Sequence, residues 1–306
     1  MSVKDEWAEL PEWVEHHLQI GVGKMYILDD GSQPPLSSVL APYIASGAVE
    51  YRWFNGVPRP TPPASTTLVK PGVEELGAGA AAPLHRELRT NFTYRNFSHF
   101  QLYAYDWCLQ HHRHHHTWMG FVDADEYILL RPDIPSLPAL LERFEQYGGL
   151  AVFSKSFGSS GHLTRPAVGT RLGFTKCQPA SKREYYKTIA NLHYVLPTFG
   201  GRRGPHSFRM RDNATTVNSR GVPVEQDMSK HVVKDEIFLH HYSIRSAEEY
   251  AAKARRGGGI HKTGRHDFSQ LKWRDSMSTL DCLDAVRHVQ RFQASSRYSG
   301  DSNPTK

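Results

Sequence analysis

Short apolar runs alternate with amphipathic stretches along much of this 306-residue chain. Residues 10–18 carry apolar side chains at helical spacing, with Pro11 in the first turn and Gly21 just beyond the last. Proline at the start and glycine after the end predict a helix there. The apolar runs 24–28 and 49–54 are too short for helices, so they predict strands.

The same alternation continues through the middle of the chain. Residues 98–110 carry an apolar stripe at helical spacing, which we interpret as the packed face of a helix. The runs 118–122, 150–153 and 237–239 predict further strands. Strands that alternate with helices are typical of an α/β protein with a mostly parallel sheet flanked by helices.

Composition changes sharply at residues 57–83, where a proline-rich stretch gives way to glycine and alanine. Such low-complexity sequence predicts a loop insertion rather than part of a packed core. Residues 291–306 are polar and predict a C-terminal tail. Because a doubly wound α/β unit often reaches this length as one body, we expect residues 1–290 to form a single domain.

The chain has a net charge of +6 and a pI near 9.1, a balance that attracts anions. The positive charges form no runs and accompany no nucleic-acid motif, so we expect no nucleic acid among the partners. The sequence lacks the run of about 18 apolar residues that a membrane helix needs. Membrane association is therefore expected only through a segment absent from this sequence.

Cysteines and glycosylation sequons bear on the compartment. The chain has three cysteines, Cys108, Cys177 and Cys282. No two of them form a CxxC pair, which argues against a zinc module or a disulfide scaffold and leaves one disulfide open. The chain also has three sequons, at Asn91, Asn96 and Asn213. Because this composition would give fewer by chance, the sequons favour a secretory compartment.

An acidic motif, Asp123-Ala-Asp-Glu126, follows the predicted strand 118–122. In an extended segment, side chains two residues apart point the same way, so Asp123 and Asp125 should face one side about 6 to 7 Å apart. Two carboxylates there repel each other unless a cation lies between them, and oxygen ligands favour Mg²⁺ or Mn²⁺. The motif therefore predicts a metal site that binds phosphate, with a solvated acidic turn as the alternative.

A second polar group follows the predicted strand 237–239. His241 lies at the end of this strand, and an imidazole can complete a metal shell begun by two carboxylates. The helix predicted next carries Lys253 and Arg256, whose charges can neutralise a diphosphate. The five histidines within residues 111–116 are also typical of metal sites, but they lie between a helix and a strand, and we interpret them as a solvated surface loop.

Together these motifs resemble glycosyltransferase family 92, in the family's order, from Lys4 to about Asp281. The resemblance rests on Lys4-Asp-Glu6, on Glu12-Trp13 with His17 and Gly21, on Asp29-Asp-Gly-Ser32, on Asp123-Ala-Asp-Glu-Tyr127, on Phe157-Gly-Ser-Ser-Gly-His162, on Lys187, and on His241-Tyr242 with Ser246, Glu249, Lys253 and Arg256-Gly257. Arg245 departs from the pattern, because the family often has lysine there and lysine has a different reach.

The resemblance implies a GT-A-type, Rossmann-like fold and a Golgi hexosyltransferase that moves galactose from UDP-galactose to a glycan hydroxyl, with inversion. It implies Mn²⁺ or Mg²⁺ as cofactor and a UDP-sugar as donor. The metal ligands it implies are Asp123, Asp125 and His241, and the donor-binding residues are Glu6, Asp29, Lys187, Lys253 and Arg256. The general base is left open among Glu126, Asp235, Glu236 and Asp267.

A GT-A sheet places its first strand centrally, and residues 1–4 are few for such a strand. We therefore expect further strand residues and a membrane anchor before Met1 in a longer form, and marginal stability without them. Two other functions stay open. A glycoside hydrolase would use two carboxylates without a metal, and a non-catalytic basic module would bind carbohydrate or polyanion without releasing UDP.

Overall fold

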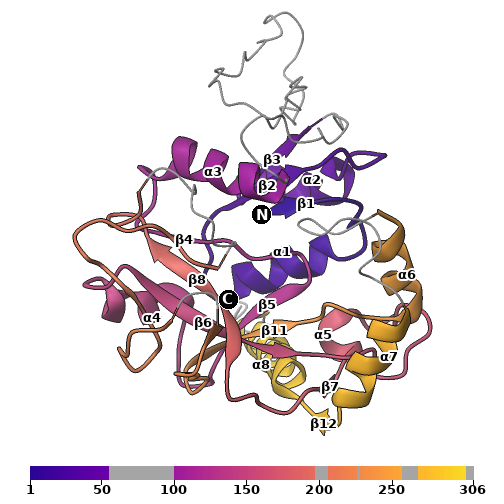
Figure 1. The fold of residues 1–306 in the computed structure, drawn as a ribbon. Coiled ribbons are helices and arrows are strands. Elements are labelled where there is room, and N and C mark those ends of the chain that lie inside the picture. The colour runs from indigo at the N-terminus through magenta and orange to yellow at the C-terminus, as the bar shows by residue number, and fades with distance from the viewer. Residues whose placement is uncertain (55–99, 197–205, 226–227, 257–267, 301–306) are drawn as a thin grey trace, which may run out of the picture.

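The computed structural model describes residues 1–54, 100–196, 206–225, 228–256 and 268–300, with side chains to residue 293. The loop insertion predicted at 57–83 lies outside these ranges. Two larger sheets and a two-stranded one, with helices around them, make up the described protein (Figure 1). None of its described helices has both the length and the apolar character that a bilayer span requires.

Three parallel strands form the smaller sheet, in the order β1–β2–β3. These strands are β1 (Ser2–Val3), β2 (Met25–Asp29) and β3 (Val49–Trp53), and they are connected by α1 (Leu10–Gln19) and α2 (Ser37–Ala45). Parallel neighbours need a crossover, which the two helices supply. Among the described strands β1 pairs with β2 alone, so it lies at an edge of this sheet rather than at the centre we expected.

The larger sheet is mixed, with the order β10–β8–β6–β11–β5, β4 beside β8 and β9 beside β6. Its strands are β4 (Trp118–Gly120), β5 (Glu126–Leu130), β6 (Gly149–Ser156), β8 (Glu184–Asn191), β9 (Thr216–Val217), β10 (Met228–Ser229) and β11 (Ile237–His241). Only the pairs β6–β11 and β6–β9 are parallel among the described pairings of this sheet.

The prediction of an α/β protein is therefore confirmed, but a fully parallel arrangement is present only in the smaller sheet. The connection from β6 to β8 explains part of the difference. It contains a loop, the one-turn helix α5 (Thr170–Gly173) and the short strand β7 (Lys176–Cys177). Because it has no long crossover helix, β8 returns antiparallel to β6.

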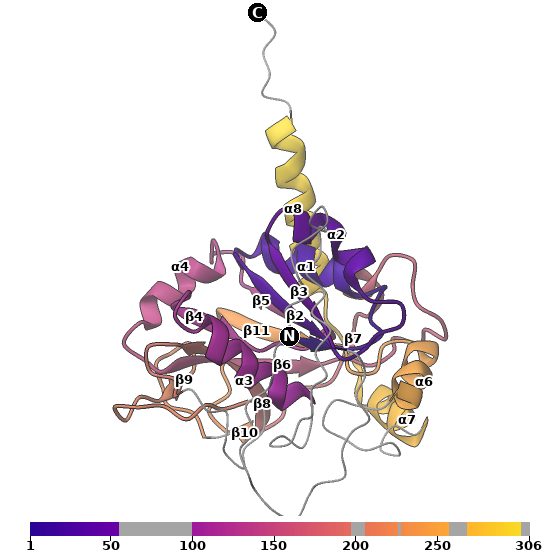
Figure 2. The ribbon, with the colours of Figure 1, turned by 90° about the horizontal axis from the view of Figure 1, so that it is seen from above.

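The remaining helices surround these sheets. They are α3 (Phe100–His112), α4 (Leu137–Leu141) with the 3₁₀ turn η1 (Glu142–Phe144), α6 (Ala247–Arg256), α7 (Phe268–Met277) and α8 (Asp284–Gly300). The stripe predicted for the helix 98–110 is buried in α3 at Phe100, Ala104 and Cys108. Helices α6 and α7 lie side by side in both views (Figures 1 and 2), where Leu271 packs with Tyr250.

A disulfide joins Cys177 to Cys282, which answers the question that the cysteine spacing left open. It lies where β7 pairs antiparallel with β12 (Leu280–Asp281). Cys108 is a free thiol in the core. The disulfide therefore ties the segment that follows α7 to the loop that follows β6.

Helix α1 brings the two sheets and the acidic motif together (Figure 1). Its buried Leu10, Trp13 and Val14 belong to one apolar core that includes residues of both sheets. Trp13 Nε1 donates to the carbonyl oxygens of Glu126 at 2.8 Å and Asp123 at 3.1 Å. The backbone of the acidic motif is thus hydrogen-bonded to a side chain of a largely buried helix.

Candidate functional site

The acidic motif forms a turn rather than an extended segment. Strand β4 ends at Gly120, and the backbone N–H of Glu126, the first residue of β5, donates to Asp123 O at 3.0 Å. The alternation of side chains along a strand therefore does not apply here. The extended geometry predicted for Asp123 and Asp125 is wrong, and within the turn each carboxylate has its own partners.

The carboxylate of Asp123 is held by three side chains from two elements. Its Oδ1 accepts from Gln101 Nε2 at 2.6 Å and from Tyr105 Oη at 3.2 Å, both on one face of α3. Its Oδ2 accepts from Lys187 Nζ at 2.7 Å, on β8. Lys187 also lies 3.2 Å from Glu126 Oε2. We did not predict Gln101 and Tyr105; their four-residue spacing was the available signal.

Lys187 is 4% exposed at its side chain, and its environment decides its charge. Burial disfavours the charged form of Lys187, but the carboxylates of Asp123 and Glu126 hold the pKa of Lys187 well above its usual value. Burial also opposes ionisation of Asp123, yet the lysine charge lowers the pKa of this carboxyl. For Glu126 burial dominates and raises the pKa. The site therefore has a permanent internal cation on the Asp123 side.

Asp125 meets the basic helix and the predicted histidine. Its Oδ2 lies 2.6 Å from Lys253 Nζ, and its Oδ1 lies 3.8 Å from His241 Nε2. The β5–β11 register, in which His241 lies opposite Glu126, brings the two segments together. The Lys253 ammonium also donates to the carbonyl oxygen of Ser243 at 3.1 Å. The structure thus brings these two motifs, distant in the sequence, close together.

The charges around Asp125 are set by the same contacts. Burial opposes its ionisation, but Lys253 and His241 hold the pKa of Asp125 well below its usual range. Burial lowers the pKa of His241 to about 4, so its ring is neutral near pH 7. A neutral imidazole next to an ionised carboxylate is the pair of ligand types that a divalent cation needs.

Two of the three predicted metal ligands lie within reach of a common ion. Asp125 Oδ1 and His241 Nε2, 3.8 Å apart, can share one ion at bond lengths of about 2.0 to 2.2 Å. The oxygens of Asp123 already accept from Lys187 and α3. In the described part of the chain, no three His, Cys, Asp or Glu side chains are arranged to hold a metal. Mg²⁺ commonly uses one or two carboxylates and completes its shell with water and phosphate.

Asp29, predicted to bind the donor, forms hydrogen bonds within its own loop in this structure. Its buried carboxylate accepts from Ser32 N at 2.8 Å, Ser32 Oγ at 2.6 Å, Leu36 N at 3.2 Å and Tyr51 Oη at 2.7 Å. Ser32 Oγ in turn accepts from Asp5 N at 2.8 Å. Asp29 thus shapes the turn at the carboxyl end of β2 and attaches it to the loop before α1.

Glu6 and Arg256, predicted to bind the donor, contact each other. Glu6 accepts two hydrogen bonds from the Arg245 guanidinium at 3.0 and 3.1 Å, and its Oε1 also contacts Arg256. Arg256 donates to the carbonyl oxygen of Asp5 at 2.9 Å. Of the predicted donor residues, Glu6 and Arg256 are therefore paired with each other.

The comparison with known proteins names the family. The sequence model of glycosyltransferase family 92 matches residues 1–242. This chain belongs to that family. A "Glycosyltransferase family 92 protein" from Ricinus communis is 27% identical over 220 residues, which cover 71% of this chain and 32% of that protein. One of the same description from Oryza sativa subsp. japonica is 25% identical over 214 residues, 68% of this chain and 29% of that protein. The chain spans about a third of the length of these relatives.

The remaining candidates for a general base in this family 92 chain lie elsewhere. Asp235 accepts from Ser219 and Arg220, and Glu236 pairs with Arg143. Both precede β11, whose other end carries His241, so a whole strand separates them from Asp125. Asp267 lies outside the described residues.

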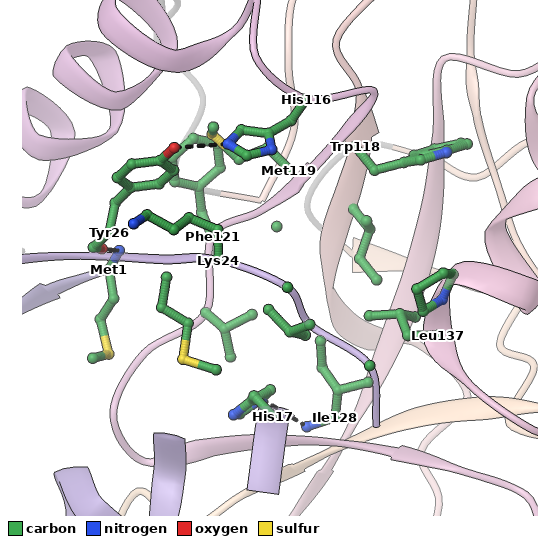
Figure 3. A pocket seen from close by; sticks show the side chains of 18 of the residues that line it. Met1, His17, Lys24, Tyr26, His116, Trp118, Met119, Phe121, Ile128 and Leu137 are labelled. Carbon is green, nitrogen blue, oxygen red and sulfur yellow. Dashed lines mark hydrogen bonds between the residues drawn. The ribbon is translucent and has the colours of Figure 1, made fainter. Parts of the chain in front are cut away.

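A cavity of about 420 Å³ lies between β2 and β4, close to the acidic motif (Figure 3). Its walls are largely apolar and include Tyr26, Met119, Phe121 and Leu137. None of the predicted metal or donor residues is among those that line it. A diphosphate needs cations and hydrogen-bond donors, so we do not assign the donor to this cavity.

The histidine tract beside this cavity is only partly the surface loop we predicted. His114 and His115 are exposed, as expected. His112, however, belongs to α3 and is buried, with its ring stacked on Tyr26 at 3.7 Å. His116 Nε2 lies 2.7 Å from Tyr26 Oη. The interpretation is wrong for His112, because the helix extends two residues further than predicted and turns this ring inwards.

Proposed function

We propose that this chain contains the catalytic site of a glycosyltransferase that moves a hexose from a UDP-sugar to a glycan hydroxyl. One observation carries the proposal. The Asp125 carboxylate lies 2.6 Å from the ammonium of Lys253 on α6 and 3.8 Å from the neutral imidazole of His241 on β11. Such a group can bind a cation and a diphosphate together.

The chain supplies much of the charge that a departing diphosphate requires. A Mn²⁺ or Mg²⁺ ion held by Asp125 and His241 would add Lewis-acid stabilisation of the leaving diphosphate. Lys253 is paired with Asp125, and in the bound state it can donate to a phosphate oxygen instead. Family resemblance further implies galactose as the sugar, inversion at the anomeric carbon, and a Golgi setting.

Asp123 and Glu126 have different roles in this proposal. The Asp123 side chain keeps 30% of its surface accessible to solvent, whereas Glu126 keeps 3%. We therefore assign contact with the donor ribose or sugar to Asp123. Glu126 holds Lys187 in place and, through its bond from the backbone N–H of Asp123, stabilises the turn. Lys187 keeps Asp123 ionised and oriented.

The direct test is release of UDP from a panel of UDP-sugars, with Mn²⁺, with Mg²⁺ and with EDTA. Replacement of the pairing carboxylate, Asp125→Asn, should lower the rate by about 100-fold or more, a loss typical of a removed transition-state contact. Asp133→Asn, in the exposed turn after β5, is the matched control and should leave the rate unchanged. Full activity of Asp125→Asn in EDTA would refute the proposed site.

A further inference from the structure

Six charged side chains form a cluster that joins the loop before α1 to helix α6. The cluster consists of Glu6, Glu9, Arg165, Arg245, Glu249 and Arg256. Three carboxylates and three guanidinium groups balance each other in charge. Each of these side chains is at most 25% exposed, so the ion pairs are shielded from water. Their stability therefore depends on how well the charged groups are placed against each other.

Arg245 lies at the centre of this cluster. Its guanidinium donates to both oxygens of Glu6, at 3.0 and 3.1 Å, and lies 2.5 Å from Glu9 and 3.7 Å from Glu249. Its side chain is 3% exposed. The backbone of Arg245 has a φ of 58°, a left-handed conformation that costs a non-glycine residue free energy. Such strain persists only where the surrounding contacts require that placement.

The cluster holds α6 at both ends. Ser246 caps the helix with Glu249: Ser246 Oγ lies 2.6 Å from Glu249 Oε2 and also accepts from Glu249 N at 3.3 Å. Arg245 precedes this cap, and Arg256 is the last helical residue. Both arginines pair with the same carboxylate, Glu6. Lys253 lies between them and reaches Asp125.

On the other side, the cluster connects to the turn at the end of β2. Asp5, adjacent to Glu6, donates its N–H to Ser32 Oγ at 2.8 Å, and Ser32 bonds to Asp29. One continuous network therefore runs from Asp29 through the loop before α1 to α6 and Asp125. Its members come from opposite ends of the chain, with Glu6 and Arg245 separated by 239 positions.

We infer that Arg245 is a positioning residue of the donor site, which sets α6 against the loop before α1 so that Lys253 reaches Asp125. This inference rests on the proposed function for its catalytic meaning. The geometric part is independent of activity. When the guanidinium is removed, α6 loses its attachment at the N-terminal end, and the Lys253–Asp125 contact opens more often.

The test measures the acylation rate of individual lysines by mass spectrometry in ligand-free protein. In Arg245→Met, the Lys253 rate should rise about fivefold or more, because reactivity follows the population of the opened contact. Lys187, buried on β8 and outside this cluster, is the internal control and should change little. Arg245→Lys, which keeps the charge, should restore most of the protection. Arg143→Met breaks another bidentate Arg–Glu pair, far from α6, and should leave Lys253 unchanged.

Two outcomes would overturn the inference: an unchanged Lys253 rate in folded Arg245→Met, or an equal rise at Lys187 and Lys253. If Arg245→Met does not fold, Glu6→Gln weakens the same attachment while it keeps the side-chain shape, and the same expectations apply. UDP affinity is measured on the same variants. A higher acylation rate of Lys253 with unchanged UDP affinity would support the positioning role and count against the proposed donor site.

Discussion

Lys187 Nζ lies 2.7 Å from Asp123 Oδ2, which places a buried ammonium beside the first carboxylate of the acidic motif. The sequence pattern predicted that Asp123 would share a metal ion with its neighbour in the motif. In this structure β8 supplies a buried cation for Asp123. The second carboxylate, Asp125, pairs with Lys253 on a peripheral helix. The two aspartates of the motif thus have different counter-charges, one buried on β8 and one on α6.

The buried lysine should be essential for stability. Lys187→Met removes a buried ammonium, 4% exposed, from beside Asp123 and Glu126. Breaking a buried ion pair in this way costs about 3 to 5 kcal/mol. We expect the free energy of unfolding in urea to fall by that amount. Lys176→Met, which removes an exposed pair with Asp281 at 2.8 Å, is the control and should cost less than about 1 kcal/mol. Equal losses in the two variants would contradict this reading.

Lys253 should contribute directly to binding of the diphosphate. A charge-assisted hydrogen bond to phosphate contributes about 1.5 to 3 kcal/mol, so Lys253→Ala should weaken UDP binding about tenfold or more. Calorimetric titration with UDP, with and without Mn²⁺, measures the effect. The control is Lys272→Ala, an exposed lysine on the neighbouring helix α7. Unchanged UDP affinity in Lys253→Ala would limit this residue to pairing with Asp125.

The disulfide should stabilise the segment around α7. Cys177 and Cys282 are 105 positions apart, and a link across so long a loop is worth about 2 to 5 kcal/mol. We expect Cys282→Ser to lower the melting temperature by about 4 to 10 °C. Dithiothreitol should produce a similar drop in the wild type and no further drop in the variant. A reductant effect that persists in Cys282→Ser would show that the loss comes from elsewhere.

Buried histidines should make the fold sensitive to mild acid. Burial lowers the pKa of His17 to about 4, and its Nδ1 lies 2.8 Å from Trp13 O. Below about pH 6.5 the unfolded chain binds a proton at this residue and the folded chain does not. Stability should therefore fall from about pH 6.5 to about pH 4, by up to about 1.4 kcal/mol per pH unit from this residue.

The matching experiment compares unfolding free energies at several pH values in this window. His17→Gln removes the titrating group, so the difference between wild type and variant should shrink as the pH falls. His114→Gln, at an exposed position, should keep the wild-type dependence of the unfolding free energy on pH. A parallel pH dependence in His17→Gln and wild type would show that His17 does not titrate differently on folding.

Local features of this protein were predictable from the sequence because they depend on nearby residues. The predicted helix 10–18 is α1, Leu10–Gln19, and the predicted strand 49–54 is β3, Val49–Trp53. Hydrophobic spacing and terminal proline or glycine act within a few residues, so they can be read from a short window. The order of the motifs also indicated the family, which the match over residues 1–242 confirms.

The direction of strand pairing and the partners of each charge were decided only by the tertiary structure. Strand β8 was not predicted, yet it carries Lys187 to within 2.7 Å of Asp123, which lies 64 positions earlier. The turn at Asp123 to Glu126 also replaced the extended geometry that the apolar run before it suggested.

Arg245 illustrates the physical reason. Its sequence neighbours predict only the start of a helix, whereas its guanidinium pairs with Glu6, 239 positions away. A charged side chain far from water is stable only beside an opposite charge, and any of several acidic residues would satisfy that requirement locally. Which one does so depends on how α6 packs against the loop before α1. The sequence therefore specified which chemical groups are present, and the packing of distant segments decided which of them meet.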